Sequence, residues 1–195
     1  MSGSTIQLFT VGTTGEGSSG ASLLNGIVKS DASGNFSITR TYNCPSDRSL
    51  VYLVATGGNP GLAAGTNNAA LALMAALGTC KNLTNTPFLN INEVTTVAAV
   101  NALAPFMSSP TTLGSSTGNA SALAAAFNLA SEFANMSTGT SPGVGVPTGT
   151  SVPTTKINTI ANIIAACNNS VGDSPRFTQA NWSWKWRSYA KHGKR

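Results

Sequence analysis

Short apolar runs dominate the first half of the chain, and helical spacing dominates the second half. In the first half, runs separated by Gly, Ser and Asn predict strands at residues 4–11, 23–29, 35–42, 50–55 and 88–92. The run at residues 50–55 is apolar at every position, which favours a central strand with both faces buried.

Four helices are predicted from apolar residues that recur every three or four positions. The first, at residues 67–77, lies among the strands and depends on Ala70, Leu73, Met74 and Leu77. The others are expected at residues 95–105, 119–135 and 154–168, with a linker rich in Gly, Pro and Thr at residues 138–153.

This order of elements indicates the α+β class. We expect an N-terminal antiparallel, β-sandwich-like sheet, followed by a helical part of about four helices. The chain then divides into a β-sandwich-like part with one inserted helix (residues 1–92), a helical part (93–175) and a basic, Trp-rich tail (176–195).

Charged residues make up only 9% of the chain, against about 25% in ordinary globular proteins. Six of the 11 basic residues follow residue 175, so residues 1–175 carry five basic and six acidic groups, a net charge of −1. A nucleic-acid partner is not expected, because it needs a basic face on the folded body. No apolar run approaches the roughly 20 residues of a membrane span. The composition favours an extracellular or cell-surface protein, although no signal peptide is visible in this sequence.

The sequence contains three cysteines. Cys44 and Cys80 flank the central strand and the predicted helix after it, and they could form a disulfide that stabilises the fold by about 3–4 kcal/mol. Cys167 is left over, which suggests either a missing partner or a buried thiol. Its place on the apolar stripe of the last helix favours the buried thiol.

Candidate chemistry is sparse. Glu93, with Asn92 and Thr95 as weaker candidates, lies where a strand meets a helix, but a carboxylate is also favoured there by the helix dipole alone. The turn Gly57, Gly58 and Asn59 could bind an anion through backbone N–H groups, although it lacks the spacing of a phosphate loop and reads more simply as a structural turn.

Metal and triad chemistry are not expected. The single histidine, His192, is close to the C-terminus, and a catalytic base needs a third group that holds it in place. The scattered cysteines and the lack of other histidines argue against a zinc site. No cofactor is expected.

Two stretches resemble a known family. Residues 2–8 (Ser-Gly-Ser-Thr-Ile-Gln-Leu) and 31–38 (Asp-Ala-Ser-Gly-Asn-Phe-Ser-Ile) resemble the carboxypeptidase-regulatory-like, or transthyretin-like, β-sandwich, which typically carries D-x-x-G-x-F-x-I. Residues 42–103, with Ala-Thr-Gly-Gly-Asn at 55–59 and Asn-Glu-Val-Thr-Thr at 92–96, resemble secreted surface proteins of Acidobacteria that contain this module. The resemblance spans about residues 2–175 and implies a fragment whose first strand would precede Ser2.

The tail departs from that resemblance. Trp182, Trp184 and Trp186 lie among most of the positive charge, and the change of composition at Arg176 suggests a segment foreign to the family. In a strand these three indoles would share one face. We expect that the tail, or an unpaired sheet edge, could join copies of the chain into a homo-oligomer.

The sequence therefore favours a non-catalytic extracellular structural or binding module, a fragment of a larger surface protein. One alternative is a weak hydrolase of activated esters or phosphoesters, with Glu93 and the Gly57–Asn59 turn lining its pocket. Another is binding of polysaccharide or anionic surfaces through the three tryptophans and the basic groups of the tail.

Overall fold

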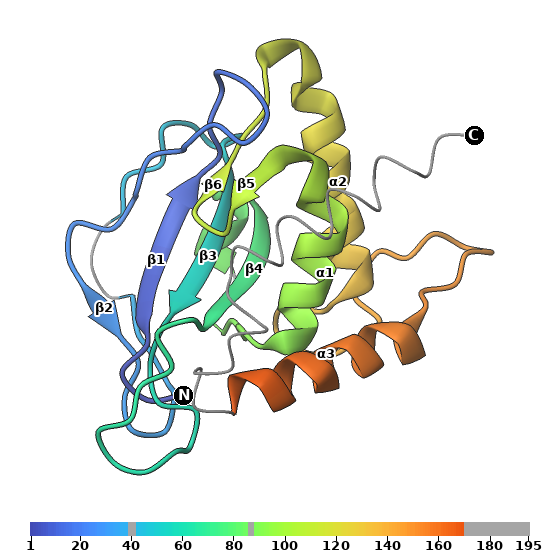
Figure 1. Ribbon diagram of the computed structural model, residues 1–195. Coiled ribbons are helices and arrows are strands. Elements are labelled where there is room, and N and C mark those ends of the chain that lie inside the picture. The colour runs from blue at the N-terminus through green and yellow to red at the C-terminus, as the bar shows by residue number, and fades with distance from the viewer. Residues whose placement is uncertain (39–41, 86–87, 170–195) are drawn as a thin grey trace.

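A four-stranded antiparallel sheet forms the centre of the fold (Figure 1). The computed structural model describes residues 1–38, 42–85 and 88–169. The strand order is β2-β1-β3-β4, in which the bounds are Thr5–Thr10 for β1, Val28–Lys29 for β2, Leu50–Thr56 for β3 and Ala72–Thr79 for β4. A second sheet is the small hairpin of β5 (Met107–Ser109) and β6 (Thr112–Leu113).

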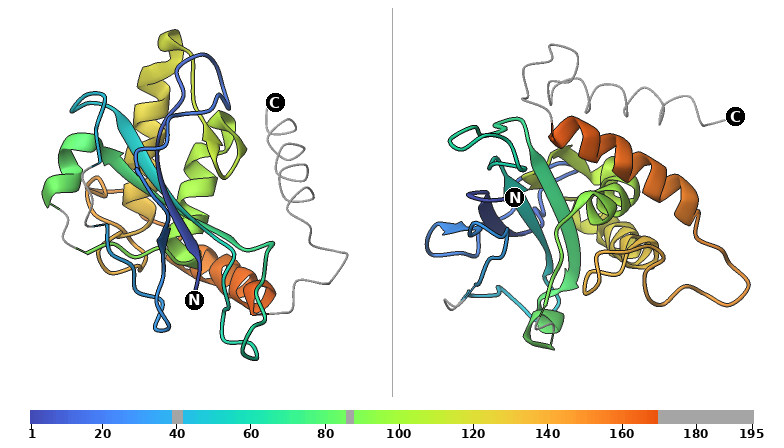
Figure 2. Two further views of the ribbon diagram at one scale, coloured as in Figure 1. Left: turned by 90° about the vertical axis from the view of Figure 1, so that its left-hand side faces the viewer. Right: turned by 90° about the horizontal axis from the view of Figure 1, so that it is seen from below.

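The α-helices follow the strands of the four-stranded sheet, as the α+β prediction requires. The described residues contain three α-helices, namely α1 (Glu93–Leu103), α2 (Ala120–Phe133) and α3 (Thr154–Asn168). Three short 3-10 helices are η1 (Cys80–Asn85), η2 (Ala104–Phe106) and η3 (Thr117–Asn119). Figure 2 shows α1 and α2 together on one face of the sheet. None of the described helices is long and apolar enough to cross a membrane.

The strands at residues 4–11 and 50–55 are confirmed as β1 and the central strand β3. The helices at 119–135 and 154–168 are confirmed as α2 and α3, and α1 begins two residues before its expected start at residue 95. Of the strand expected at 23–29, only β2 forms. Residues 35–38 and 88–92 are not strands, and residues 39–41 of the expected strand at 35–42 lie outside the described residues.

The prediction of a helix at residues 67–77 is wrong, because β4 occupies residues 72–79. β4 pairs with β3 from Leu50 opposite Thr79 to Thr56 opposite Ala72. Met74 lies in the core beneath the helices, whereas Leu73 lies in the core on the other face. A strand that is apolar on both faces hides its two-residue period, so its Ala and Leu residues also matched helical spacing. Pairing with β3 overrides the local helix preference.

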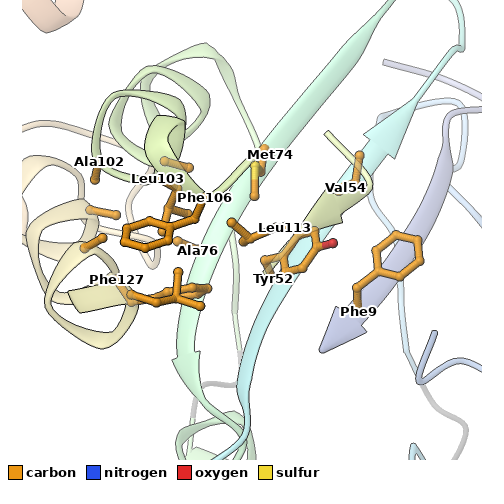
Figure 3. Close-up of a cluster of buried hydrophobic side chains, with 14 residues drawn as sticks. Phe9, Tyr52, Val54, Met74, Ala76, Ala102, Leu103, Phe106, Leu113 and Phe127 are labelled. Atoms are coloured by element: carbon orange, nitrogen blue, oxygen red, sulfur yellow. The ribbon is translucent and has the colours of Figure 1, made fainter. Parts of the chain in front are cut away.

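The core between the sheet and the helices combines side chains from residues 1–92, the predicted β-sandwich-like part, with side chains from the predicted helical part that follows (Figure 3). The ring of Tyr52 is fully buried and stacks on Phe9, with centroids 5.5 Å apart. Leu103 of α1 and Phe127 of α2 close the same core from the helical side. The strands and these two helices therefore share one apolar interior. The opposite face of the sheet is covered by loops that carry Leu23, Leu24, Phe36, Ile38 and Tyr42.

Burial of Tyr52 makes alkaline stability testable. An ordinary tyrosine has a pKa of about 10, and burial raises the pKa of Tyr52 to about 12. Between these values the unfolded chain releases the phenolic proton while the folded protein keeps it. The stabilisation is therefore complete below pH 10 and is lost as the pH rises towards 12. Urea unfolding from pH 9 to 11.5 should show a steeper alkaline fall in wild type than in Tyr52→Phe, and equal slopes would contradict this assignment.

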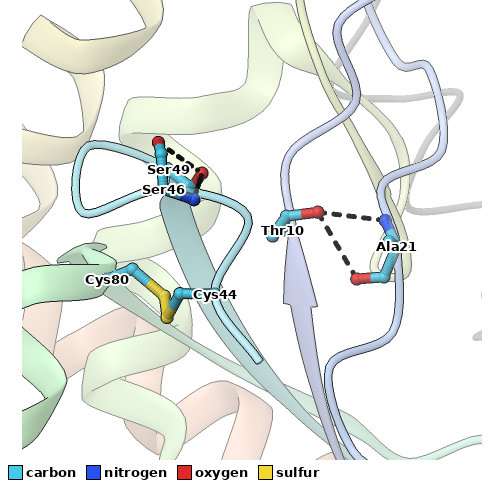
Figure 4. Close-up of a disulfide and its surroundings, with 6 residues drawn as sticks. All are labelled: Thr10, Ala21, Cys44, Ser46, Ser49 and Cys80. Atoms are coloured by element: carbon cyan, nitrogen blue, oxygen red, sulfur yellow. Dashed lines mark hydrogen bonds between the residues drawn. A yellow bond between two sulfur atoms is a disulfide. The ribbon is translucent and has the colours of Figure 1, made fainter. Parts of the chain in front are cut away.

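The end of β1 needs a glycine beside it. Thr10 N–H donates to the Ala21 carbonyl at 2.9 Å. Figure 4 shows the Thr10 hydroxyl, which accepts from Ala21 N–H at 3.0 Å and donates to the Ala21 carbonyl at 3.4 Å. Gly20 therefore lies directly against the Thr10 carbonyl, and a Cβ at this position would overlap that oxygen.

Gly20→Ala should lower the free energy of unfolding by more than about 2 kcal/mol, because the backbone has to shift. Gly118→Ala is the matched control, since a Cβ there meets nothing within 4 Å. Urea unfolding of both variants measures the difference. Equal stability of the two variants would show that the contact between Gly20 and the Thr10 carbonyl does not exclude a Cβ.

The predicted disulfide between Cys44 and Cys80 is confirmed, with Cα atoms 6.2 Å apart (Figure 4). It joins the segment before β3 to the first residue of η1, just after β4. Cys80 N–H also donates to the Ser49 carbonyl at 2.8 Å. The crosslink and this hydrogen bond together close the open end of the β3–β4 hairpin.

Candidate functional site

A chain of hydrogen bonds links the two groups of residues that the sequence singled out. Asn68 N–H donates to the Gly58 carbonyl at 2.9 Å, and Asn68 Nδ2 donates to the Asn168 carbonyl at 3.0 Å. Asn168 Nδ2 in turn donates to Glu93 Oε1 at 3.1 Å. The turn after β3 and the start of α1 therefore belong to one polar network, which we call the asparagine network (Gly58, Asn68, Glu93 and Asn168).

Sequence reasoning did not assign Asn68 or Asn168 to this site. They are 100 residues apart in the chain, yet only 4% and 9% exposed. Buried amides need hydrogen-bond partners, but no local spacing marks which asparagines of an Asn-rich chain are buried. The signal exists only in the tertiary structure.

Asn92 and Thr95 form the capping box of α1. Asn92 Oδ1 accepts from Thr95 N–H at 2.9 Å, and Thr95 Oγ1 accepts from Asn92 N–H at 3.0 Å. Asn92 Nδ2 donates to the Gly139 carbonyl at 2.8 Å. These bonds satisfy N–H groups that a helix start leaves open. The polar atoms of Asn92 are thus committed to the fold. The cap is Asn92, whereas Thr95 occupies the third helical position.

The same helix start also binds the outer edge of β4. Met74 N–H donates to Thr96 Oγ1 at 2.9 Å, and Thr95 Oγ1 lies 3.1 Å from the Met74 carbonyl, to which it donates. Thr95 is fully buried and Thr96 is 7% exposed. The two hydroxyls replace the partner strand that an edge strand lacks.

Glu93 is half-buried at the first position of α1. Its carboxylate accepts from Asn168, and its charge lies where the helix dipole favours an anion. No second carboxylate is joined to it by the hydrogen bonds of the asparagine network. A mechanism that uses two facing carboxylates needs a partner for Glu93 that this network does not supply.

Hydrogen bonds to neighbouring residues of the same loop hold the Gly57–Asn59 turn in place. Gly57 and Gly58 have φ angles of 64° and 96°, and a Cβ on Gly58 would overlap Ser4 Oγ. Asn59 Oδ1 accepts from Leu62 N–H at 2.6 Å, and Asn59 Nδ2 donates to the Leu62 carbonyl at 3.0 Å. Gly57 N–H donates to the carbonyl of Leu71 at 2.9 Å. The amide of Asn59 therefore closes its own loop.

A shallow, open depression of about 310 Å³ lies beside this turn. Its walls come from the N-terminal residues, the turn after β2 and the β3–β4 loop, and they contain Met1, Ser2, Ala32, Ser33, Asn59, Pro60, Gly61 and Leu62. Among the described residues, no charged side chain lines it. Their side chains offer hydroxyl and amide groups but no acid, base or nucleophile activated by a neighbour.

Two other carboxylates, Asp31 and Glu16, also serve local structure. The N–H of Asn35 donates to Asp31 Oδ1 at 2.8 Å and holds the pKa of that carboxyl below its usual value. The amide of Asn119 donates to Glu16 Oε1 at 3.0 Å and lowers the pKa of Glu16. Within the described ranges, no group of three or more His, Cys, Asp or Glu side chains could hold a metal ion.

Cys167 and four residues of the tail are the other candidates that the sequence singled out. Cys167 is half-buried rather than buried, and it forms no disulfide among the described residues. Trp182, Trp184, Trp186 and His192 lie outside the described residues. No protein-family model, curated protein or solved structure matches the chain.

The link between α1 and β4 can be tested by removing one hydroxyl. Thr96→Val keeps the side-chain shape but leaves the buried Met74 N–H without its acceptor, which should cost about 1–3 kcal/mol of the free energy of unfolding. Thr159→Val is the control, because this exposed hydroxyl on α3 donates only to the Thr155 carbonyl, and it should cost less than about 0.5 kcal/mol. Urea unfolding compares the variants, and a similar small effect from both would argue against the link.

Proposed function

We propose that this chain is a non-catalytic extracellular module with a structural or binding role. The observation that carries the proposal is the use made of the candidate catalytic side chains. Asn92 and Thr95 cap a helix and Thr95 also binds a strand edge, while Glu93 is bound by Asn168. A catalytic side chain must be able to reach the substrate. The hydrogen-bonding groups of these side chains instead bind other parts of the fold.

Two properties support an extracellular setting. Disulfides persist mainly in oxidising compartments, and the Cys44–Cys80 bond closes the hairpin at the centre of this fold. Ionic groups are also few, at 9% of residues, so solubility depends on hydroxyl and amide groups. The resemblance to transthyretin-like modules of secreted surface proteins agrees with both properties.

The hydrolase alternative has less support. It needs Glu93 and the Gly57–Asn59 turn to face a common pocket. The asparagine network links them only indirectly, through the hydrogen bonds of Asn68 and Asn168. The described walls of the depression beside Asn59 contain no charged side chain. Binding through the tryptophans of the tail remains a separate proposal that depends on residues outside those described.

Activity measurements on Glu93→Gln separate the two roles. We expect no hydrolysis of p-nitrophenyl acetate or p-nitrophenyl phosphate above the uncatalysed rate by wild type or by the variant. Loss of the anion at the start of α1 should lower the free energy of unfolding by about 0.3–1 kcal/mol. Glu132→Gln is the matched control, since that carboxylate lies near the end of α2, where the helix dipole does not favour an anion. Wild-type turnover that Glu93→Gln abolishes and Glu132→Gln retains would overturn the proposal.

A further inference from the structure

The helix α3 is attached to the rest of the fold in an unusual way. Twenty residues, 134–153, separate it from α2. The first half of this connection is fixed to the body, because Gly143 N–H donates to the Glu132 carbonyl at 2.8 Å and Val144 N–H donates to the Ser131 carbonyl at 3.0 Å. Asn90 N–H also donates to the Met136 carbonyl at 2.8 Å. The connection is therefore part of the body up to Val144.

The second half is not fixed in this way. Within the described part of the chain, the hydrogen bonds found for residues 145–151 are those of Thr150 to the Pro147 carbonyl, inside the segment itself. All of these residues are exposed except Val146, which is half-buried. In Figure 1 the segment extends away from the sheet and from α1 and α2 before it returns to α3. Residues 145–151 thus act as a free span between two anchored regions.

Among the described residues, the apolar cluster that holds α3 has three buried members. α3 packs against α1 through a cluster whose buried members are Val97, Ile157 and Ala161. Half-buried Val94, Phe133, Val152, Ile160 and Ile164 surround it. The core under α1 and α2 contains no residue of α3. At the far end, the helix is bound through the bonds of Asn168 to Asn68 and Glu93.

We propose that α3 is a releasable arm, which opens from residue 145 to residue 169 while the sheet, α1 and α2 stay folded. Regions with few buried apolar contacts open at a lower free energy than the core, and the free span at 145–151 lets α3 move without disturbing Val144. Opening uncovers the apolar face of α1 at Val94 and Val97 and frees the carboxylate of Glu93 from Asn168. The closed arm therefore covers a surface that the body presents only in its open state.

Hydrogen exchange of the full chain, read by mass spectrometry of peptic peptides, tests this. The amides of α3 should exchange at least about 100-fold faster than those of β3. Ile157→Ala, which removes a buried side chain from the arm's contact, should accelerate exchange in α3 by about 10-fold or more and leave β3 unchanged.

Two controls sharpen the result. Ile163→Ala makes the same truncation on the same helix at a side chain that is 52% exposed, and it should change α3 exchange by less than about 3-fold. Leu123→Ala, in the core under α2, should accelerate exchange in β3, α1 and α2 together. Equal exchange rates for α3 and β3 in wild type would overturn the proposal. So would an Ile157→Ala variant in which every segment accelerates to the same extent.

Discussion

The fold depends on the contact between the first turn of α1 and the outer edge of β4. A helix start leaves N–H groups without partners, and an edge strand leaves a row of backbone groups unpaired. Here one short run of polar residues serves both needs, since Asn92 caps the helix while Thr95 and Thr96 bind Met74. Because these bonds are buried, they fix α1 against the sheet at a defined position. The position of α1 in turn places α2 and α3.

The sheet is covered differently on its two faces. α1 and α2 bury Tyr52, Val54 and Met74 on one face, whereas irregular segments between β1 and β3 bury Leu53 and Leu73 on the other. Loop segments have few repeating hydrogen bonds with which to hold themselves in place. The turn at Asp31 and the disulfide at Cys44 supply fixed points in this covering layer. The close contact between Gly20 and the Thr10 carbonyl supplies another fixed point.

Local patterns predicted the elements whose burial is one-sided or whose ends carry clear signals. The stripe of α2, with Leu123 and Phe127, and the uniformly apolar β3 are examples. β4, like β3, is buried on both faces, but its Ala and Leu residues also fit helical spacing, so its composition did not distinguish a strand from a helix. A helix start close to residues 92–96 was expected, but the bonds of Thr95 and Thr96 to Met74 were not, because they depend on tertiary contact. The partnership of Asn68 with Asn168 depends entirely on tertiary proximity.

The disulfide has a mechanical consequence. Cys44 and Cys80 are 36 positions apart, and β3 and β4 both lie inside the covalent loop that they close. Tension applied along the backbone passes through the sulfur bridge and bypasses these two strands. Because the bridge closes the loop, the fully stretched chain would be shorter by roughly 120 Å, at about 3.4 Å per residue. Backbone tension would therefore not extend β3 and β4 themselves, whereas force on β1 would still reach β3 through the hydrogen bonds between the two strands.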